Sequence, residues 1–436
     1  MAKRKAGPRW RLRRLLPALL VAGCTVGPDF VAPRAWFPKS WFSSQPPGAA
    51  APGSPVSSEP VAETIQPEWW AGFRDPELTS IEKRVAAANL DVRAATIRLA
   101  ESRAERRITA AAEFPQINGS AFYMRQLPSE KGVLSLFGSS GSSTETAGAN
   151  GIPSTVTGTQ IPAFNLWQYG FDASWELDLW GRVRRSIEAA DATIEASAEA
   201  RRDILLSVLA EVARDYIQLR GIQTQLQISR ANLRIARESL ALTKMRAANG
   251  LATELDVADA SAQVSTTEAT IPRLEEQQAQ AINRLSFLLG EPPRTLAAEL
   301  ATPHAIPPVP PKVPVGLPSE LAHRRPDIRQ AEAQLHAQTA EIGVAVANFY
   351  PAITLNGSFA LQAVDFKNLG SWAARTYTIG PGISLPIFEG GRLVGNLRLT
   401  EAQQQEAAIL YQRTVLAAWQ EVDDALTAYA AEQRRR

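Results

Sequence analysis

The stretch LWQYGFDASWELDLWGR, residues 166–182, alternates large apolar side chains with small or polar ones before it ends in a Gly-Arg pair. The odd positions from Trp167 to Trp175 are apolar, and the even positions from Gln168 to Glu176 are Gly or polar. Because successive side chains of a strand point to opposite faces, this pattern predicts a β-strand with one apolar and one polar face. A period of two over about 10 residues, with aromatic residues near the ends, is typical of a strand between lipid and water.

Two other segments show the same trend, NFYPAITLNGSFALQ (348–362) and YTIGPGISLPIFEGGR (377–392), and EFPQINGSAFY (113–123) is predicted as the fourth strand. The predicted lipid-facing residues are Trp167, Tyr169, Phe171, Trp175, Ile353, Leu355, Phe359, Tyr377, Ile379 and Ile383. The predicted lumen-facing residues are Gln168, Asp172, Ser174, Glu176, Asn356 and Ser358. A soluble antiparallel sheet with one buried face is the alternative, and four such strands behind an export signal favour a membrane barrel.

The four strands form two copies of one pattern, a β-hairpin at 113–180 with a long loop and a β-hairpin at 348–390 with a short loop. The Asn-Gly-Ser triplets at 118–120 and 356–358 are further apart in the chain than the corresponding arginines, Arg182 and Arg392. The difference roughly matches the longer first loop, which would be extracellular, so an internal repeat is the economical explanation. Four strands cannot close a barrel, and the chain is therefore predicted to oligomerise.

The N-terminus carries seven basic residues before position 15, then the apolar run Leu15 to Ala22 and the single cysteine, Cys24. This predicts a signal peptide at 1–23 and, since Val21 to Cys24 resembles the lipobox of bacterial lipoproteins, lipidation of Cys24. A buried core cysteine is the alternative. Loss of seven positive charges changes the formal charge from +2 to about −5, which removes support for a nucleic-acid partner. After position 24 the sequence has no stretch of about 20 apolar residues, so no membrane-spanning helix is predicted.

Residues 181–290 predict a long antiparallel helical hairpin, because Leu226, Leu233 and Leu240 and a second set, Ile228, Ile235 and Leu242, recur at heptad spacing. About 68 residues of helix would reach roughly 100 Å, with interruptions conceivable at Gly221 and Pro272. The turn predicts an Asn-Gly C-cap and a Thr253 N-cap. Coiled-coil packing explains most of this segment. The expected docking surface is its tip, formed by Asn249, Gly250, Leu251, Thr253 and Asp256.

Several motifs together resemble the outer membrane factor family (TolC-like), in particular the NodT-type outer-membrane lipoproteins of resistance-nodulation-division (RND) efflux systems. The matching stretches are CTVGPDF (24–30), WWAGFRDPEL (69–78), FPQINGSA (114–121), ELDLWGRVRR (176–185) and GLPSELAHRRPDIRQAEAQL (316–335). The resemblance implies an α+β membrane protein in which a trimeric outer-membrane β-barrel, four strands per chain, continues into a long periplasmic α-helical coiled-coil tunnel. Thr25, in place of an Asp that would resemble an inner-membrane retention signal, favours the outer membrane of a Gram-negative bacterium.

The resemblance also assigns the remaining segments. Residues 24–75 become a lipidated tether, 76–112 a periplasmic helix, 291–317 a proline-rich equatorial segment, 318–347 a periplasmic helix with Pro326 and Asp327 near an N-terminus, and 391–436 a final periplasmic helix. Copy one continues from Gly181 to Gly290, whereas copy two runs only from Gly391 to Arg436, which is less than half as long. The counterpart of the helical stretch 227–290 is therefore expected to be missing from a truncated second hairpin, and no gate residues are carried over.

The resemblance implies that the protein is the outer-membrane channel component of a tripartite efflux system, a passive exit duct for drugs, metals or other small molecules. The implied partners are a homotrimer, a periplasmic adaptor (membrane fusion protein), an inner-membrane RND pump and outer-membrane lipid. No enzyme activity, cofactor or metal site is predicted, because the three histidines are scattered and no phosphate loop occurs. The alternatives are a type I secretion exit duct and a non-conducting, structural coiled-coil lipoprotein.

Overall fold

A computed structural model describes residues 25–33, 58–61, 63, 66–127, 163–316, 320 and 324–435. The chain divides into two compact units. The first contains residues 25–28, 107–187 and 341–399, and the second contains the other described residues. Cys24, the expected signal peptide 1–23 and most of the long first loop lie outside the described residues.

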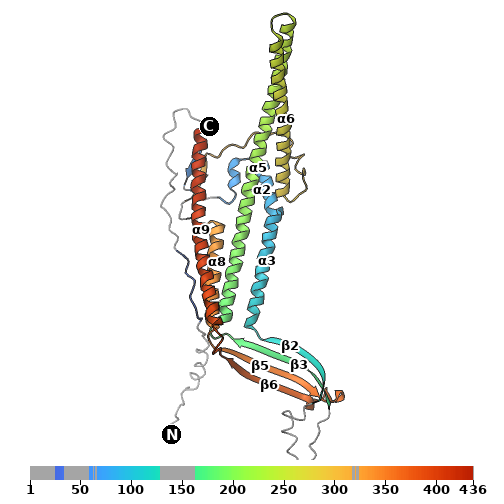
Figure 1. The fold of residues 1–436 in the computed structure, drawn as a ribbon, viewed down its shortest axis with the longest axis vertical. Helices are drawn as coiled ribbons and strands as arrows, with labels where there is room; N and C mark the ends of the chain where they lie inside the picture. The colour runs from blue at the N-terminus through green and yellow to red at the C-terminus, as the bar shows by residue number, and fades with distance from the viewer. Residues whose placement is uncertain are drawn as a thin grey trace, which may run out of the picture. The chain divides into compact units, whose positions relative to one another are not determined.

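The first unit is built on one four-stranded antiparallel sheet, in the order β2-β3-β5-β6 (Figure 1). Its strands are β2 Gln116–Gln126, β3 Phe164–Leu177, β5 Ala352–Ala363 and β6 Arg375–Ser384. Two 3-10 turns, η5 Phe366–Asn368 and η6 Trp372–Ala374, lie between β5 and β6. Within the described chain, the outer edges of β2 and β6 pair with no other strand.

Each strand pair connects to helices. Helix α3 (Leu90–Ala110) and the 3-10 turn η3 (Ala111–Glu113) lead into β2, and helix α8 (Pro326–Ala347) leads into β5. Helix α5 (Arg182–Ala248) follows β3, and helix α9 (Arg392–Arg435) follows β6. The two halves have the same order of elements, namely helix, strand, strand and helix. Among the described residues, no helix combines the length and the apolar character that a membrane span requires.

The main core of the second unit joins helix α2 (Pro76–Ala88) to α5 and to helix α6 (Glu254–Leu288). Asp75 caps α2 by accepting hydrogen bonds from two backbone N–H groups of its first turn, at 2.9 and 3.0 Å. The apolar face that follows is fully buried. The fully buried side chains of this core include Leu78, Ile81, Val85, Tyr216, Leu219, Leu285 and Leu300.

Two ionisable side chains, Arg220 and Glu82, are buried beside this core. The guanidinium of Arg220 pairs with Glu77, donates to Oε1 of Gln223 at 2.8 Å and donates to the carbonyl of Thr302 at 3.1 Å. It thereby ties α5 to α2 and to the proline-rich segment. Glu82 is also fully buried, and its carboxylate oxygens have no hydrogen-bond partner among the described residues. Burial raises the pKa of Glu82 to about 8, so this side chain is largely protonated at neutral pH.

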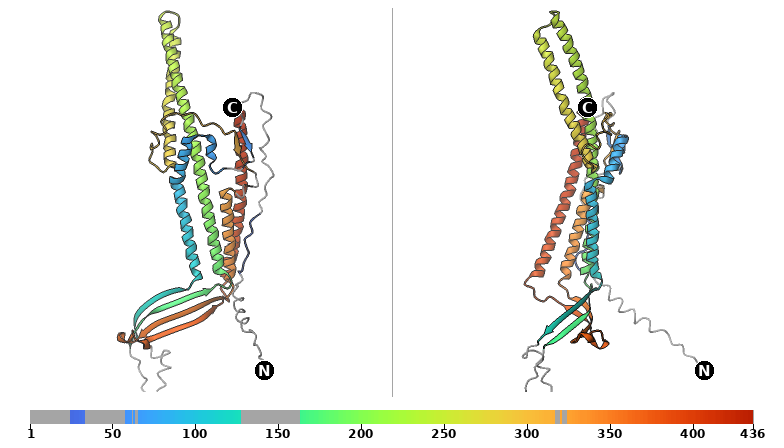
Figure 2. Two further views of the ribbon diagram at one scale, coloured as in Figure 1. Left: turned by 180° about the vertical axis from the view of Figure 1, so that it is seen from behind. Right: turned by 90° about the vertical axis from the view of Figure 1, so that its right-hand side faces the viewer.

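The helical hairpin consists of α5 and α6, which run antiparallel (Figure 2). Helix α5 is one continuous helix of 67 residues, so Gly221 does not interrupt it, and α6 continues through Pro272. Of the two heptad stripes, Leu226 and Leu233 are buried, whereas the second stripe is more than half exposed. The members of the second stripe are Ile228, Ile235 and Leu242.

Part of the expected tether is a strand. Strand β1 (Glu59–Val61) pairs in parallel with β4 (Lys312–Pro314), which lies in the proline-rich segment. The amide of Gln433 near the end of α9 donates to the carbonyl of Ser58. Residues 58–61 are therefore attached to the second unit.

Helix α8 begins at Pro326, as the sequence predicts, and packs on α9 through Ile328, which is fully buried. Arg325 precedes the helix and donates to Asp327 at 2.7 Å and to Glu421 of α9 at 2.8 Å. Residues 325–328, within the matching stretch 316–335, thus join α8 to α9 by an apolar contact and a charged one.

Candidate functional site

The sheet of the first unit has two chemically different faces. In an antiparallel pair, residues directly opposite each other point to the same face. The register pairs Trp175 with Leu355 and Phe359 with Tyr377, and it places all the predicted lipid-facing residues on one face. These residues are Trp167, Tyr169, Phe171, Trp175, Ile353, Leu355, Phe359, Tyr377, Ile379 and Ile383. Those of β6 are the most open, since Ile379 is 75% exposed.

The opposite face carries all the predicted lumen-facing residues, Gln168, Asp172, Ser174, Glu176, Asn356 and Ser358. Its side chains bond across the strands: the Ser174 hydroxyl donates to Oδ1 of Asn356 at 2.9 Å, and the Ser120 hydroxyl lies 3.4 Å from Asp172. Glu176 accepts from Arg182 at 2.9 Å and so joins the end of β3 to the start of α5. The face is hydrogen-bonded and water-compatible.

Strand β2 contributes apolar residues that sequence reasoning did not include. Ile117 and Tyr123 lie on the apolar face, and the Tyr123 ring contacts the Trp167 ring with centroids 4.2 Å apart. Phe122 and Met124 lie on the polar face. The apolar residues at odd positions of β2 could have predicted its apolar face, but the small residues Gly119 and Ala121 among them weaken this alternation.

The junction between β3 and α5 is closely packed. The Asp178 carboxylate accepts hydrogen bonds from two backbone N–H groups in the first turn of α5, at 2.9 and 3.2 Å. The Trp180 ring stacks on Tyr350 with centroids 4.8 Å apart and donates from Nε1 to the carbonyl of Pro351 at 2.8 Å. The segment after β3 is thus attached to the segment before β5.

The residues after Cys24 dock at this junction. The backbone N–H of Val26 donates to the carbonyl of Trp180 at 3.1 Å. Gly181 has a φ of +82°, and a Cβ there would lie 2.7 Å from Cγ2 of Thr25. A Cβ on Gly27 would lie 2.5 Å from the Cα of Gly343, so the two backbones approach too closely for a side chain. Residues 25–27 of the CTVGPDF motif therefore have a packing role directly after the predicted lipid site.

The predicted docking residues meet in the turn between α5 and α6. Gly250 has a φ of +72° and donates to the carbonyl of Ala247 at 2.9 Å, and Leu251 donates to that of Arg246 at 2.8 Å. This pair of bonds is a Schellman motif. Leu251 itself is 77% exposed. The turn therefore presents an apolar side chain on a rigid backbone.

The return helix α6 begins with a capping box. The Thr253 hydroxyl accepts from the backbone N–H of Asp256 at 3.2 Å, and the backbone N–H of Thr253 donates to the Asp256 carboxylate at 2.7 Å. These bonds from Thr253 lower the pKa of Asp256. The turn has the caps that the sequence predicts, whereas its docking role stays a prediction.

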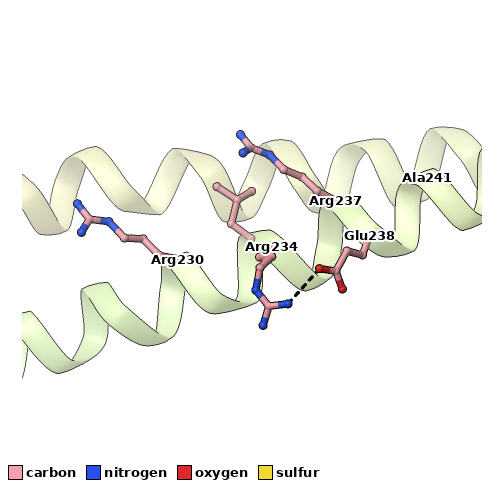
Figure 3. Close-up of a pocket in the computed structure, with 6 residues that line it drawn as sticks. Arg230, Arg234, Arg237, Glu238 and Ala241 are labelled. Atoms are coloured by element: carbon pink, nitrogen blue, oxygen red, sulfur yellow. Dashed lines mark hydrogen bonds and ion pairs between the residues drawn. The ribbon is translucent and has the colours of Figure 1, made fainter.

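A groove on the hairpin is lined by basic residues of α5 (Figure 3). Arg230 pairs with Glu275 and Arg237 with Glu268 of α6, each at 2.8 Å, and Arg234 pairs with Glu238 at 3.0 Å. Exposed pairs of this kind contribute little to stability, but they neutralise the groove. The described part of the chain contains no group of three or more His, Cys, Asp or Glu residues that could hold a metal ion.

The chain matches the family model described as outer membrane efflux protein over residues 83–291 and 317–436. It is 31% identical to Nodulation protein T of Rhizobium leguminosarum bv. viciae over 96% of this chain and 78% of that protein. It is 32% identical to outer membrane protein OprJ of Pseudomonas aeruginosa over 97% of this chain and 81% of that protein. The solved structure of the outer-membrane channel OprN superposes with a TM-score of 0.80 at 32% identity, covering 94% of this chain and 84% of that one.

The family match includes both of the long helical segments and both β-hairpins. The two-faced sheet and the helical hairpin are thus parts of a fold shared with known channels. The chain belongs to the outer membrane efflux protein family and is an outer-membrane channel protein for efflux, with a periplasmic helical domain.

Proposed function

We propose that three copies of the chain close one twelve-stranded barrel that turns its apolar face to lipid and its polar face to a water-filled lumen. The observation that carries this proposal is the two-faced sheet with two unpaired edges. Isolated sheet edges expose unpaired backbone groups, which lipid cannot satisfy. Four strands are too few for closure, and three copies supply twelve.

The channel is passive in this proposal. A lipid on Cys24 holds the chain in the outer membrane, a periplasmic adaptor docks at the turn around Leu251, and an inner-membrane RND pump supplies the energy. The helical domain then forms a coiled-coil tunnel, to which the exposed stripe at Ile228, Ile235 and Leu242 contributes a second packing surface. Small molecules such as drugs or metal ions are the cargo we propose, ahead of polypeptides of a type I secretion system.

Conductance tests the channel itself. The purified full-length chain, reconstituted in planar bilayers, is expected to give ion-conducting steps. Glu176→Gln should change the cation preference of these steps because Glu176 lies on the polar face. Absence of conductance under every opening condition would favour a structural coiled-coil lipoprotein instead.

Docking at the turn is tested by a matched pair of charge reversals. Asp256→Arg, as well as Gly250→Pro, should abolish drug or metal resistance in cells while trimers still assemble. Asp259→Arg makes the same charge change one turn further along α6 and should preserve resistance. Adaptor docking at this turn would be contradicted if all three variants kept wild-type resistance, or if all three lost it to the same extent.

A further inference from the structure

The two free edges of the sheet are rich in exposed apolar side chains. Ile117 on β2 is 69% exposed, and Ile383 on β6 is 72% exposed. Directly after β6, Ile387 is 91% exposed and Phe388 is 89% exposed. These four side chains all belong to the first unit, and they mark the surface that needs a partner.

The internal repeat can be aligned through the register of the two hairpins. The aromatic-proline pair Phe114-Pro115 recurs as Tyr350-Pro351, and the Gly-Arg pair at 181–182 recurs at 391–392. The aromatic-proline pairs are 236 residues apart, and the Gly-Arg pairs are 210 residues apart. Adding 236 to Gln116 and 210 to Ser174, which pair in the first hairpin, gives Ala352 and Ser384. That pair is the one observed between β5 and β6. The two hairpins therefore have the same register.

The Asn-Gly-Ser triplets at 118–120 and 356–358 do not mark equivalent positions. The offset between them would move Gln116 to Thr354, but Thr354 pairs with Gly382 and not with Ser384. The expectation that the triplets are part of the repeat is corrected by two positions. Their similarity is local, whereas the aromatic-proline and Gly-Arg pairs stand where each strand begins and each following helix starts.

The contact between β3 and β5 joins the end of copy one to the start of copy two. If the repeat continues from chain to chain, β6 of one copy meets β2 of the next in the same way. The observed pair Leu177↔Ile353 then becomes Ile387 opposite Ile117 of the next chain. The observed pair Ser174↔Asn356 becomes Ser384 opposite Ser120 of the next chain.

We propose that adjacent chains join β6 to β2 in this register, with Ile387 covering Ile117 and Ser384 facing Ser120. This inference rests on the proposed oligomer and specifies its interface. Both offsets of the repeat are even, so odd residues of β6 face odd residues of β2, and the apolar face continues across the chain boundary. The strands alternate in direction through the sheet, so β6 and the next β2 are antiparallel.

The polar face offers the sharper test, because it is water-accessible in the proposed barrel and two serines can be changed to cysteine conservatively. Directly opposite residues in an antiparallel pair have Cα atoms about 4.5–5.5 Å apart, which suits a disulfide. A slip of two residues separates them by about 7–8 Å, beyond the usual disulfide range. The full-length chain with Ser384→Cys and Ser120→Cys is therefore oxidised with copper phenanthroline in outer-membrane fractions and analysed on non-reducing gels.

The two matched controls combine Ser384→Cys with Asn118→Cys, the register that the triplets would require, or with Phe122→Cys. We expect intermolecular cross-links to form at least about fivefold faster with Ser120→Cys than with either control. Each single-cysteine variant, which retains Cys24, measures background. Amine-reactive cross-linking of every variant before oxidation reports whether it assembles.

The outcomes separate the register from the oligomer. If either control cross-links fastest, the proposed register is wrong but the proposed oligomer stands. The same conclusion follows if the variants assemble as trimers and no cysteine pair cross-links. Chains that stay monomeric in amine-reactive cross-linking, as wild type and in all variants, would overturn the proposed barrel together with this interface.

Discussion

The strand-to-helix junctions of the two hairpins share a Gly-Arg pair but differ at the two positions that pack and cap the first junction. At the first junction, Asp178 caps α5, and Trp180 packs on Tyr350. At the second junction, the equivalent positions are Phe388 and Gly390, which offer neither a carboxylate cap nor a ring in the place of Trp180. Phe388 is almost fully exposed.

The difference follows from what each junction has beside it. The first junction lies against the start of β5 within the same chain, so its side chains are packed and hydrogen-bonded. The second lies beside the free edge of β6, where the described chain supplies no neighbouring strand. Two hairpins of one chain can thus share the same register while their side chains differ according to what lies beside them.

The largest effect is expected from removing the ring of the first junction. Trp180→Ala deletes the stacking on Tyr350 and the hydrogen bond to Pro351, and it should lower the free energy of unfolding by about 2 to 3 kcal/mol. Phe388→Ala should change that free energy by less than about 0.5 kcal/mol in the monomer, because the ring is exposed. Urea titration of the detergent-solubilised monomer measures both. Equal losses would contradict the comparison.

A smaller effect is expected from the equivalent glycines Gly181 and Gly391, whose φ angles are +82° and +87°. Either Gly→Ala change introduces left-handed strain of about 1 kcal/mol or more. At Gly181 the new Cβ also meets Thr25, whereas nothing lies within 4 Å of it at Gly391. Gly181→Ala should therefore destabilise more, and only this variant should speed hydrogen exchange at the Val26 amide. Faster exchange there in Gly391→Ala would argue against the assigned contact.

The helix cap gives the next effect in size. Asp178→Ala removes the acceptor for two N–H groups of α5 and should lower the free energy of unfolding by about 1 kcal/mol. Phe388→Asp places the same carboxylate before α9 and should raise it by up to about 1 kcal/mol. The pair is read out by thermal unfolding, followed by the loss of the helical circular dichroism signal. A carboxylate that stabilises α5 but not α9 would show that the two junctions differ in backbone as well, and no loss in Asp178→Ala would contradict the cap.

A change at Glu82 should affect neither strand-to-helix junction, because Glu82 lies in the second unit and both junctions lie in the first. Its folded-state pKa of about 8 exceeds the ordinary value of 4.5, so the folded chain holds a proton that the unfolded chain releases. The contribution of Glu82 to stability is therefore fully present below pH 4.5 and is lost as the pH rises through about 8. Glu82→Gln should abolish this fall in Tm across that pH range. A pH profile that matches wild type would mean that Glu82 is ionised in the folded state.

The elements that the sequence predicts well depend on local rules. Strand β3 follows from its period of two, and the caps at Gly250 and Thr253 follow from residues that adopt those conformations readily. The start of α8 at Pro326 follows from the fixed φ of proline. In each case, the pattern and the structural reason lie within one or two turns of chain.

The elements that the sequence does not predict depend on distant partners. Strands β1 and β4 are very short and lie far apart in the chain, so neither has a readable period. Arg220 is fully buried although its sequence context resembles a solvated helix face. The error in the repeat alignment arose because a matching triplet is a local resemblance, while register is a property of two paired strands.

Thr25 and Val26 dock beside Gly181 and so fix the chain next to Cys24, the residue that we propose to be lipidated. Consecutive Cα atoms are about 3.8 Å apart, so the lipid that we propose on Cys24 would begin one peptide unit before Thr25. With the proposed lipid on Cys24, the chain between the anchor and the end of β3 is too short to move far, so the anchor would hold the boundary between β3 and α5 close to the membrane surface.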